Sequence, residues 1–175
     1  IIDLDPQGNA STGLGVDYGQ RENSIYEVLA GQANILDSIR KTEIDNLFLI
    51  PSTVDLSGIE PELADVNDRA FTLKNIFNAN EKLNEFDFIF IDCPPALSLL
   101  TVMAMTTANA IIVPLQCEFF ALEGLSQLIK TIERVRQNLN PGLSIDGIVL
   151  TMYDSRNKLS SQVATDVRNH LREQV

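Results

Sequence analysis

The chain contains 175 residues, of which 45% are hydrophobic and 21% are charged. This is the composition of an ordinary globular protein and excludes an intrinsically disordered segment, and the length predicts a single domain over residues 1–175. The 13 Lys and Arg residues against 24 Asp and Glu residues give a net charge of −11, which excludes a protein that binds nucleic acid over its whole surface.

Five apolar runs rich in β-branched and aromatic residues end abruptly in a polar residue or a proline. They cover residues 1–5, 47–52, 88–92, 111–116 and 145–154. Runs without polar alternation are typical of strands that are buried on both faces of a parallel sheet. We therefore expect five such strands.

Helix-length stretches with one apolar face follow several of these runs. They cover residues 70–83, 121–139 and 160–175. Strands that alternate with helices predict an α/β fold with a doubly wound, mainly parallel sheet and helices on both faces. Ligands of such sheets bind at the carboxyl ends of the strands. Polar residues lie at these ends, namely Asp5, Ser52, Asp92, Gln116 and Asp154.

The first run carries two acidic residues, Asp3 and Asp5, which are two apart and so point to the same side of a strand. Burial of Asp3 within an apolar run is costly unless a cation or hydrogen-bond donors meet it, which favours a functional site. The alternative is an ordinary strand exit, because Asp5-Pro6 and Gly8-Asn9 are common turn pairs.

The third run ends in Asp92, followed by Cys93, Pro94 and Pro95. An aspartate at a strand end suits the hydrated Mg²⁺ of a nucleotide-hydrolysing site, because its carboxylate can hold a metal-bound water. Many strands of α/β proteins end in this way without a metal, so the pattern alone leaves both interpretations open.

Four motifs together resemble the ParA/Soj partitioning ATPases in order and spacing, over nearly the whole chain. They are DLDPQGN with STGLG at residues 3–15, IDCPP at 91–95, VPLQCE with ALEGL at 113–125, and LTMYD at 150–154. The family belongs to the deviant Walker A P-loop group, which also includes MinD.

The resemblance implies ATP and Mg²⁺ as cofactors and assigns roles at the first and third strands. Asp5 matches the carboxylate that orients the attacking water, and Asp3 matches its supporting neighbour. Asp92 matches the Walker B aspartate, which holds Mg²⁺ through water. Pro94 and Pro95 match the switch that senses the γ-phosphate.

Further along the chain, the resemblance places Thr151, Met152 and Asp154 near the nucleotide base. Arg156 corresponds to a basic position on the face that family members use for sequence-independent DNA binding. The expected partners are a second copy of the chain on ATP binding, a ParB/Spo0J-like centromere-binding protein, and non-specific DNA.

The charge distribution also favours a basic surface near the C-terminal end. Residues 1–129 carry six basic and 19 acidic side chains, whereas residues 130–175 carry seven and five. Arg168 and Arg172 are four residues apart and share a helical face. Phosphate contacts there would be weak and sensitive to salt, and the alternative is a plain solvated helix surface.

Two cysteines, Cys93 and Cys117, form no disulfide framework, which favours a reducing compartment. The apolar runs are too short to cross a bilayer, and none resembles a signal peptide. We therefore expect a cytoplasmic, nucleoid-associated protein with no membrane attachment.

The sequence departs from the family in one respect. The Gly-rich phosphate loop with its lysines is absent, since no G-x-x-x-x-G-K-[ST] stretch occurs in the 175 residues. The chain opens without Met inside an apolar run, so we expect the natural protein to extend upstream and these residues alone to bind ATP weakly or not at all. A MinD-like membrane-associated ATPase and a catalytically inactive scaffold remain alternatives.

Overall fold

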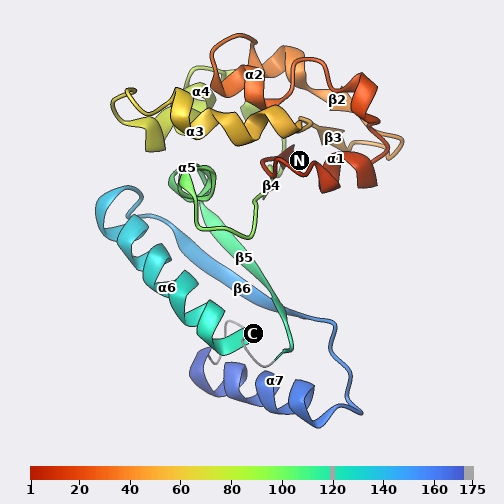
Figure 1. Ribbon diagram of the computed structural model, residues 1–175, viewed down its shortest axis with the longest axis vertical. Coiled ribbons are helices and arrows are strands. Elements are labelled where there is room, and N and C mark those ends of the chain that lie inside the picture. The colour runs from red at the N-terminus through yellow and green to blue at the C-terminus, as the bar shows by residue number, and fades with distance from the viewer. Residues whose placement is uncertain (119–120, 172–175) are drawn as a thin grey trace. The chain divides into compact units, whose positions relative to one another are not determined.

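The computed structural model describes residues 1–118 and 121–171 (Figure 1). The chain divides into an N-terminal unit, Ile1–Thr107, and a C-terminal unit, Ala108–Val175. Both units combine parallel strand pairs with helices, which confirms the predicted α/β class. The single domain expected from the length stays a prediction.

The centre of the N-terminal unit is strand β1, Ile2–Asp3, which lies between two other segments. On one side it pairs in parallel with β4, Ile91–Asp92, with Asp3 opposite Asp92. On the other side Ile2 forms a parallel bridge to Ile50, just after β3, Phe48–Leu49. Strand β2, Arg40–Lys41, runs antiparallel to β3. The first strand is therefore buried on both faces, as its apolar sequence predicts.

Short helices surround these strands and enclose the core of the N-terminal unit. The α-helices are α1 (Asn9–Gly13), α2 (Ile25–Leu29), α3 (Ile59–Glu62), α4 (Thr72–Asn78) and α5 (Leu99–Thr107). The 3₁₀ helices are η1 (Tyr18–Gln20), η2 (Ile35–Ser38), η3 (Val54–Gly58), η4 (Arg69–Phe71) and η5 (Glu81–Glu85). Leu4, Ile25, Leu73 and Met103 are fully buried in one apolar cluster that these elements share with β1.

The helix predicted over residues 70–83 is not continuous. It is divided among η4, α4 and η5, because the segment after α4 leaves the helical conformation. Asn80 has φ −127° and ψ 80°, and its side-chain amide donates to Ile76 O across 2.7 Å. The asparagine thereby satisfies a carbonyl at the end of α4 and stops the helix there.

Three predicted strands are shorter than expected. The first ends at Asp3, because Asp5 enters a turn in which its carbonyl accepts from Gly8 N across 2.9 Å. The run over 47–52 is paired as β3 only at residues 48–49. The run over 88–92 forms strand β4 only at residues 91–92, although Phe90 O before it accepts from Ile2 N across 2.7 Å. Phe88 and Phe90 are 80% and 55% exposed, and their rings are stacked.

The C-terminal unit consists of a parallel strand pair with two helices beside it (Figure 1). Strand β5, Ala110–Gln116, pairs with β6, Ser144–Thr151, and helix α6, Ala121–Asn138, connects them. Helix α7, Lys158–Leu171, follows β6. Its core is an apolar cluster of β5, β6, α6 and α7, which includes Val113, Leu115, Leu125, Ile148, Val163 and Val167. The predicted elements at 111–116 and 121–139 are thus confirmed within one or two residues.

The last predicted strand, residues 145–154, ends three residues early. Met152 has φ 53°, a left-handed conformation that interrupts the strand after Thr151. Asp154 and Arg156 therefore lie in the turn between β6 and α7. The predicted start of α7 at Ser160 is two residues late, and residues 172–175 lie outside the described part of the chain.

Candidate functional site

Three predicted site residues come together at the carboxyl ends of β1 and β4 in the N-terminal unit. The register places Asp3 directly opposite Asp92, and Leu4 N donates to Asp92 O across 2.7 Å. Partial burial raises the pKa of Asp92, and the Asp3 and Asp5 carboxylates raise it further. The arrangement is a cluster of like charges, which attracts a cation.

Asp3 is the fully buried member of this cluster, and hydrogen-bond donors satisfy its carboxylate. One oxygen, Oδ2, accepts from Ser11 N across 2.7 Å and from Ser11 Oγ across 2.6 Å. The other, Oδ1, accepts from Asp5 N across 3.2 Å. Hydrogen-bond donors, one of the two possibilities that the sequence leaves for this carboxylate, therefore meet it. Asp3 thus anchors the turn that follows β1, and Ser11 is a partner that the sequence did not reveal.

Asp5 differs from Asp3 because it has already left the strand. It is half-buried, and its Oδ1 accepts from Gln7 N across 3.0 Å. Its other carboxylate oxygen has no hydrogen-bond partner among the described residues, so it is free to accept from water or a ligand. Strand β1 thus ends before Asp5, but the carboxylates of Asp3 and Asp5 both lie close enough to Asp92 to raise its pKa.

The turn after β4 carries the residues predicted to form a switch. Pro94 is half-buried and Pro95 is exposed, and both lie between β4 and α5. Glu60 Oε1 accepts from Leu99 N across 3.0 Å at the start of α5. The far end of this turn is thereby fixed to α3.

Cys93 lies beside the carboxylate cluster, and its thiol is expected to be unreactive. Burial, with the added repulsion of Asp92 and Asp5, raises the pKa of its thiol to about 12. A thiol with so high a pKa is protonated at neutral pH and is a poor nucleophile and a poor metal ligand.

The residues present fit a magnesium ion that is held mainly by water and phosphate. Among the side chains that the structure describes, no group of three or more from His, Cys, Asp and Glu is arranged to hold a metal ion alone. Mg²⁺ commonly takes only one or two carboxylates and completes its shell with water and phosphate oxygens. Asp92 is partly exposed, and the neighbouring Asp3 and Asp5 carboxylates repel its negative charge, which suits contact with a cation through water.

In the C-terminal unit, the predicted nucleotide-base segment forms the exit from β6. Thr151 is half-buried, and its carbonyl accepts from Cys117 N across 3.3 Å. Met152 is 78% exposed and has the left-handed φ noted above. Such a conformation is unusual for a residue with a side chain and often marks a functional turn.

Asp154 and Arg156, which the resemblance assigns to different ligands, contact each other. Arg156 Nε donates to Oδ1 of Asp154 across 3.0 Å, and Nη2 donates to Oδ2 across 2.9 Å. This paired geometry lowers the pKa of Asp154 and raises that of Arg156. The two side chains remain 45% and 88% exposed, so the ion pair is weak and easily exchanged for other partners.

Of the other two predicted DNA contacts, Arg168 lies on α7. Val163 and Val167 are buried, whereas Arg168 is exposed to solvent. Arg172 lies outside the described residues. Arg156 and Arg168 are therefore the two predicted basic residues that the structure places on the surface of the C-terminal unit.

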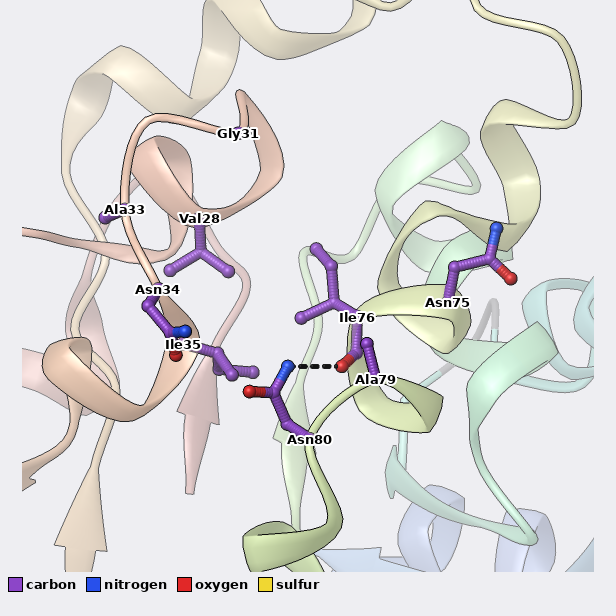
Figure 2. Close-up of a pocket in the computed structure, with 9 residues that line it drawn as sticks. All are labelled: Val28, Gly31, Ala33, Asn34, Ile35, Asn75, Ile76, Ala79 and Asn80. Atoms are coloured by element: carbon purple, nitrogen blue, oxygen red, sulfur yellow. Dashed lines mark hydrogen bonds between the residues drawn. The ribbon is translucent and has the colours of Figure 1, made fainter.

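A shallow depression of about 360 Å³ lies elsewhere in the N-terminal unit (Figure 2). It is lined by residues of α2, η2 and α4 and the segments that follow α2 and α4. Val28, Ile35 and Ile76 supply apolar atoms, and Asn34 and Asn80 supply amides. None of the predicted site residues lines it, so it is distinct from the carboxylate cluster.

Comparison with known proteins identifies the family. The AAA_31 family model, described as an AAA domain, matches residues 1–145. Over its whole length the chain is 54% identical to the chromosome partitioning protein ParA of Caulobacter vibrioides, of which it covers 66%. It is 42% identical over its whole length to the sporulation initiation inhibitor protein Soj of Bacillus subtilis and covers 68% of that protein. This chain belongs to the ParA/Soj family. The resemblance seen in the four sequence motifs is thus confirmed.

Solved structures share the fold of this chain. A Mycobacterium smegmatis protein titled cobyrinic acid a,c-diamide synthase, with bound ATP analog and magnesium, is 39% identical and superposes with a TM-score of 0.88 over 96% of this chain and 68% of its own. Apo McdA of Cyanothece, at 22% identity, shares the fold with a TM-score of 0.87 over 99% of this chain and 70% of its own.

The chain spans about two thirds of the length of the ParA and Soj relatives that it matches. Within the part that the structure describes, no helix is both long enough and apolar enough to cross a membrane.

Proposed function

We propose that the protein is an ATPase that partitions DNA, binds ATP with Mg²⁺, dimerises on ATP binding and contacts DNA without sequence preference. The observation that carries this proposal is the carboxylate cluster at the ends of β1 and β4, in a chain of the ParA/Soj family. The proposed setting is the cytoplasm, in association with the nucleoid, and the proposed partner is a ParB/Spo0J-like centromere-binding protein.

Phosphoryl transfer needs positioning and charge neutralisation more than covalent chemistry from the protein. Asp5 has an unpaired carboxylate oxygen at a fixed turn, which suits it to orient a water molecule. Asp92 would hold Mg²⁺ through water, and the bound ion would neutralise phosphate charge. Asp3 would act indirectly, by fixing the turn that carries Asp5.

Pro94 and Pro95 would respond to the γ-phosphate, since they join the Asp92 end of β4 to α5. Thr151, Met152 and Asp154 would lie near the base. On the surface, Arg156, Arg168 and Arg172 would contact phosphates of DNA.

The test is ATP hydrolysis by the full-length protein and three Asp→Asn variants. Asp5→Asn should retain ATP binding and lose hydrolysis by about 100-fold or more. Asp92→Asn should weaken ATP binding in Mg²⁺ but not in EDTA. Asp45→Asn, in the exposed turn between β2 and β3, is the matched control and should match the wild type. ATP binding without hydrolysis in the wild type would favour the inactive scaffold instead.

Residues 1–175 alone form a second test of where the ATP site lies. They contain no G-x-x-x-x-G-K-[ST] stretch to surround the phosphates. We expect titration calorimetry to show weak ATP binding or none. Tight binding by these residues would mean that the site does not depend on such a loop.

A further inference from the structure

Arg21 is a buried arginine in the N-terminal unit that the sequence does not single out. Only 7% of it is exposed. No carboxylate of residues 1–118 and 121–171 lies within ion-pair distance of its guanidinium. A buried charge without a counterion is costly unless hydrogen bonds satisfy it.

Neutral acceptors from three parts of the chain bind this guanidinium. Nε donates to Val16 O across 3.0 Å, Nη1 donates to Ser52 O across 3.1 Å, and Nη2 donates to Thr12 Oγ1 across 2.7 Å. The ring of Tyr18 lies 5.8 Å from Cζ and adds a cation–π contact. Arg21 therefore links helix α1 to the segment that follows β3.

The guanidinium also lies against the turn that carries Asp5. A Cβ built on Gly8 would clash with Nη1 of Arg21, and Gly8 has φ +63°, which favours glycine. Gly8 N donates to Asp5 O across 2.9 Å, and Gly8 O accepts from Thr12 N across 3.0 Å and Thr12 Oγ1 across 3.1 Å. Arg21 thus supports the Asp5–Gly8 turn both by direct contact and through Thr12.

Ser52 takes part both in the contacts of Arg21 and in the contacts that hold Asp3. Ser52 O accepts from Arg21, while Ser52 N donates to Ser11 Oγ across 3.0 Å. Ser11 Oγ in turn donates to Asp3. Ser52, which is fully buried, is therefore linked to the Asp5 end of the turn through Ser11 and Asp3. Arg21 links the same residue to the Gly8 end.

We propose that Arg21 is a positioning residue that sets the place of Asp5 by bracing the Asp5–Gly8 turn. The expected effect on catalysis rests on the proposed function. The claim that Arg21 holds the turn in place rests only on the contacts of Arg21 described above. Loss of the guanidinium should let the turn move, which misplaces Asp5 without removing any group that binds the nucleotide.

The experiment compares Arg21→Met and Thr12→Val with the wild type in the full-length protein. Arg40→Met is the control, because Arg40 also donates to two backbone carbonyls, Asp37 O and Glu22 O, but makes no hydrogen bond to Gly8 or Thr12 among the described residues. The readouts are kcat and KM for ATP, and native-state hydrogen exchange of the Gly8 and Thr12 amides.

Arg21→Met should lower kcat at least about 10-fold with KM nearly unchanged, and should speed exchange of both amides by about 10-fold or more, with the rest of the unit unaffected. Thr12→Val should act in the same direction but less, and Arg40→Met should match the wild type. A purely structural role would instead lower protection throughout the unit and leave kcat of the folded enzyme unchanged, which would overturn the proposal.

Two outcomes keep the proposal separate from the proposed function and from folding. If the wild type does not hydrolyse ATP, the proposed function fails, and exchange at Gly8 and Thr12 still decides whether Arg21 braces the turn. If Arg21→Met does not fold, Thr12→Val tests whether these contacts hold the turn. Unchanged exchange of the Gly8 amide in Thr12→Val would then overturn the proposal.

Discussion

The hydroxyl of Ser11 donates to the carboxylate of Asp3 across 2.6 Å, and both residues are fully buried. The contact joins helix α1 to strand β1. It also explains how a carboxylate is tolerated inside an apolar strand, because the same serine donates a second hydrogen bond from its backbone.

Ser11→Ala should destabilise the protein by roughly 2–3 kcal/mol, because it removes a hydrogen bond to a buried charge and leaves Ser52 N without its acceptor. Urea unfolding measures the change. Ser57→Ala is the control, since Ser57 Oγ donates to Val54 O at an exposed position. Equal effects of the two substitutions would contradict the role given to Ser11.

Gly8→Ala should cost about 2–4 kcal/mol of stability, since Gly8 has a left-handed backbone and no room for a Cβ beside Arg21. Gly13→Ala is the matched control. Gly13 lies in α1 with open space around it, so alanine there should be neutral or stabilise by up to about 1 kcal/mol. Thermal or urea unfolding compares them, and a neutral Gly8→Ala would show that the turn is not fixed.

Asp92→Asn should stabilise the protein at pH 7. Because burial and the neighbouring carboxylates raise the pKa of Asp92 in the folded state, its ionisation opposes folding as pH rises above the ordinary value of 3.8. The substitution should raise the melting temperature at pH 7 by about 1–2 °C, a small change because Asp92 is partly exposed. The gain should shrink towards pH 3, where the acid is protonated in both states. A gain that is the same at both pH values would not come from ionisation.

Cys93 should resist alkylation in the folded protein. A pKa of about 12, compared with 9.0 for a free thiol, reduces the thiolate fraction at pH 8 by about 1,000-fold. Iodoacetamide labelling followed by mass spectrometry should modify Cys93 only after denaturation. Rapid labelling of the native protein would mean that the thiol is exposed or that the carboxylates are neutralised.

Arg156→Ala should weaken DNA binding by the full-length protein at low salt and reduce the slope of log K against log salt concentration by about 1. Asp154→Asn should act in the opposite direction, because it releases the guanidinium of Arg156 from its ion pair. Fluorescence anisotropy with two unrelated duplexes measures both effects. Arg40→Ala, in the N-terminal unit, is the control, and equal losses for Arg40→Ala and Arg156→Ala would contradict the assignment.

The hydrophobic pattern of the sequence was sufficient to predict the bounds of two long elements of this fold. Helix α6 has 18 residues with one apolar face, and β5 is a continuous apolar run, so both were predicted almost to the residue. Helices α1, α2 and α3 have only four or five residues, too few to show a period.

The proximity of Asp3, Asp5 and Asp92 was predictable, because the carboxyl ends of neighbouring parallel strands meet at one edge of the sheet. The roles of Ser11 and Arg21 were not. Their contacts depend on the left-handed turn at Gly8, and nothing in an isolated arginine of an acidic segment shows which carbonyls it will reach.

The stacked pair Phe88 and Phe90 has a practical consequence for work with residues 1–175 alone. Both residues are more than half exposed and precede strand β4, which pairs with β1 over Ile91 and Asp92, and Phe90 O also accepts from Ile2 N. Strand β4 has β1 as its one neighbour in its sheet within the described residues, and an unpaired strand edge beside exposed aromatic side chains is a template for pairing between molecules. We therefore expect concentrated samples of these residues to aggregate through the Phe88–Phe90 segment, and a lysine in place of Phe88 to keep them in solution.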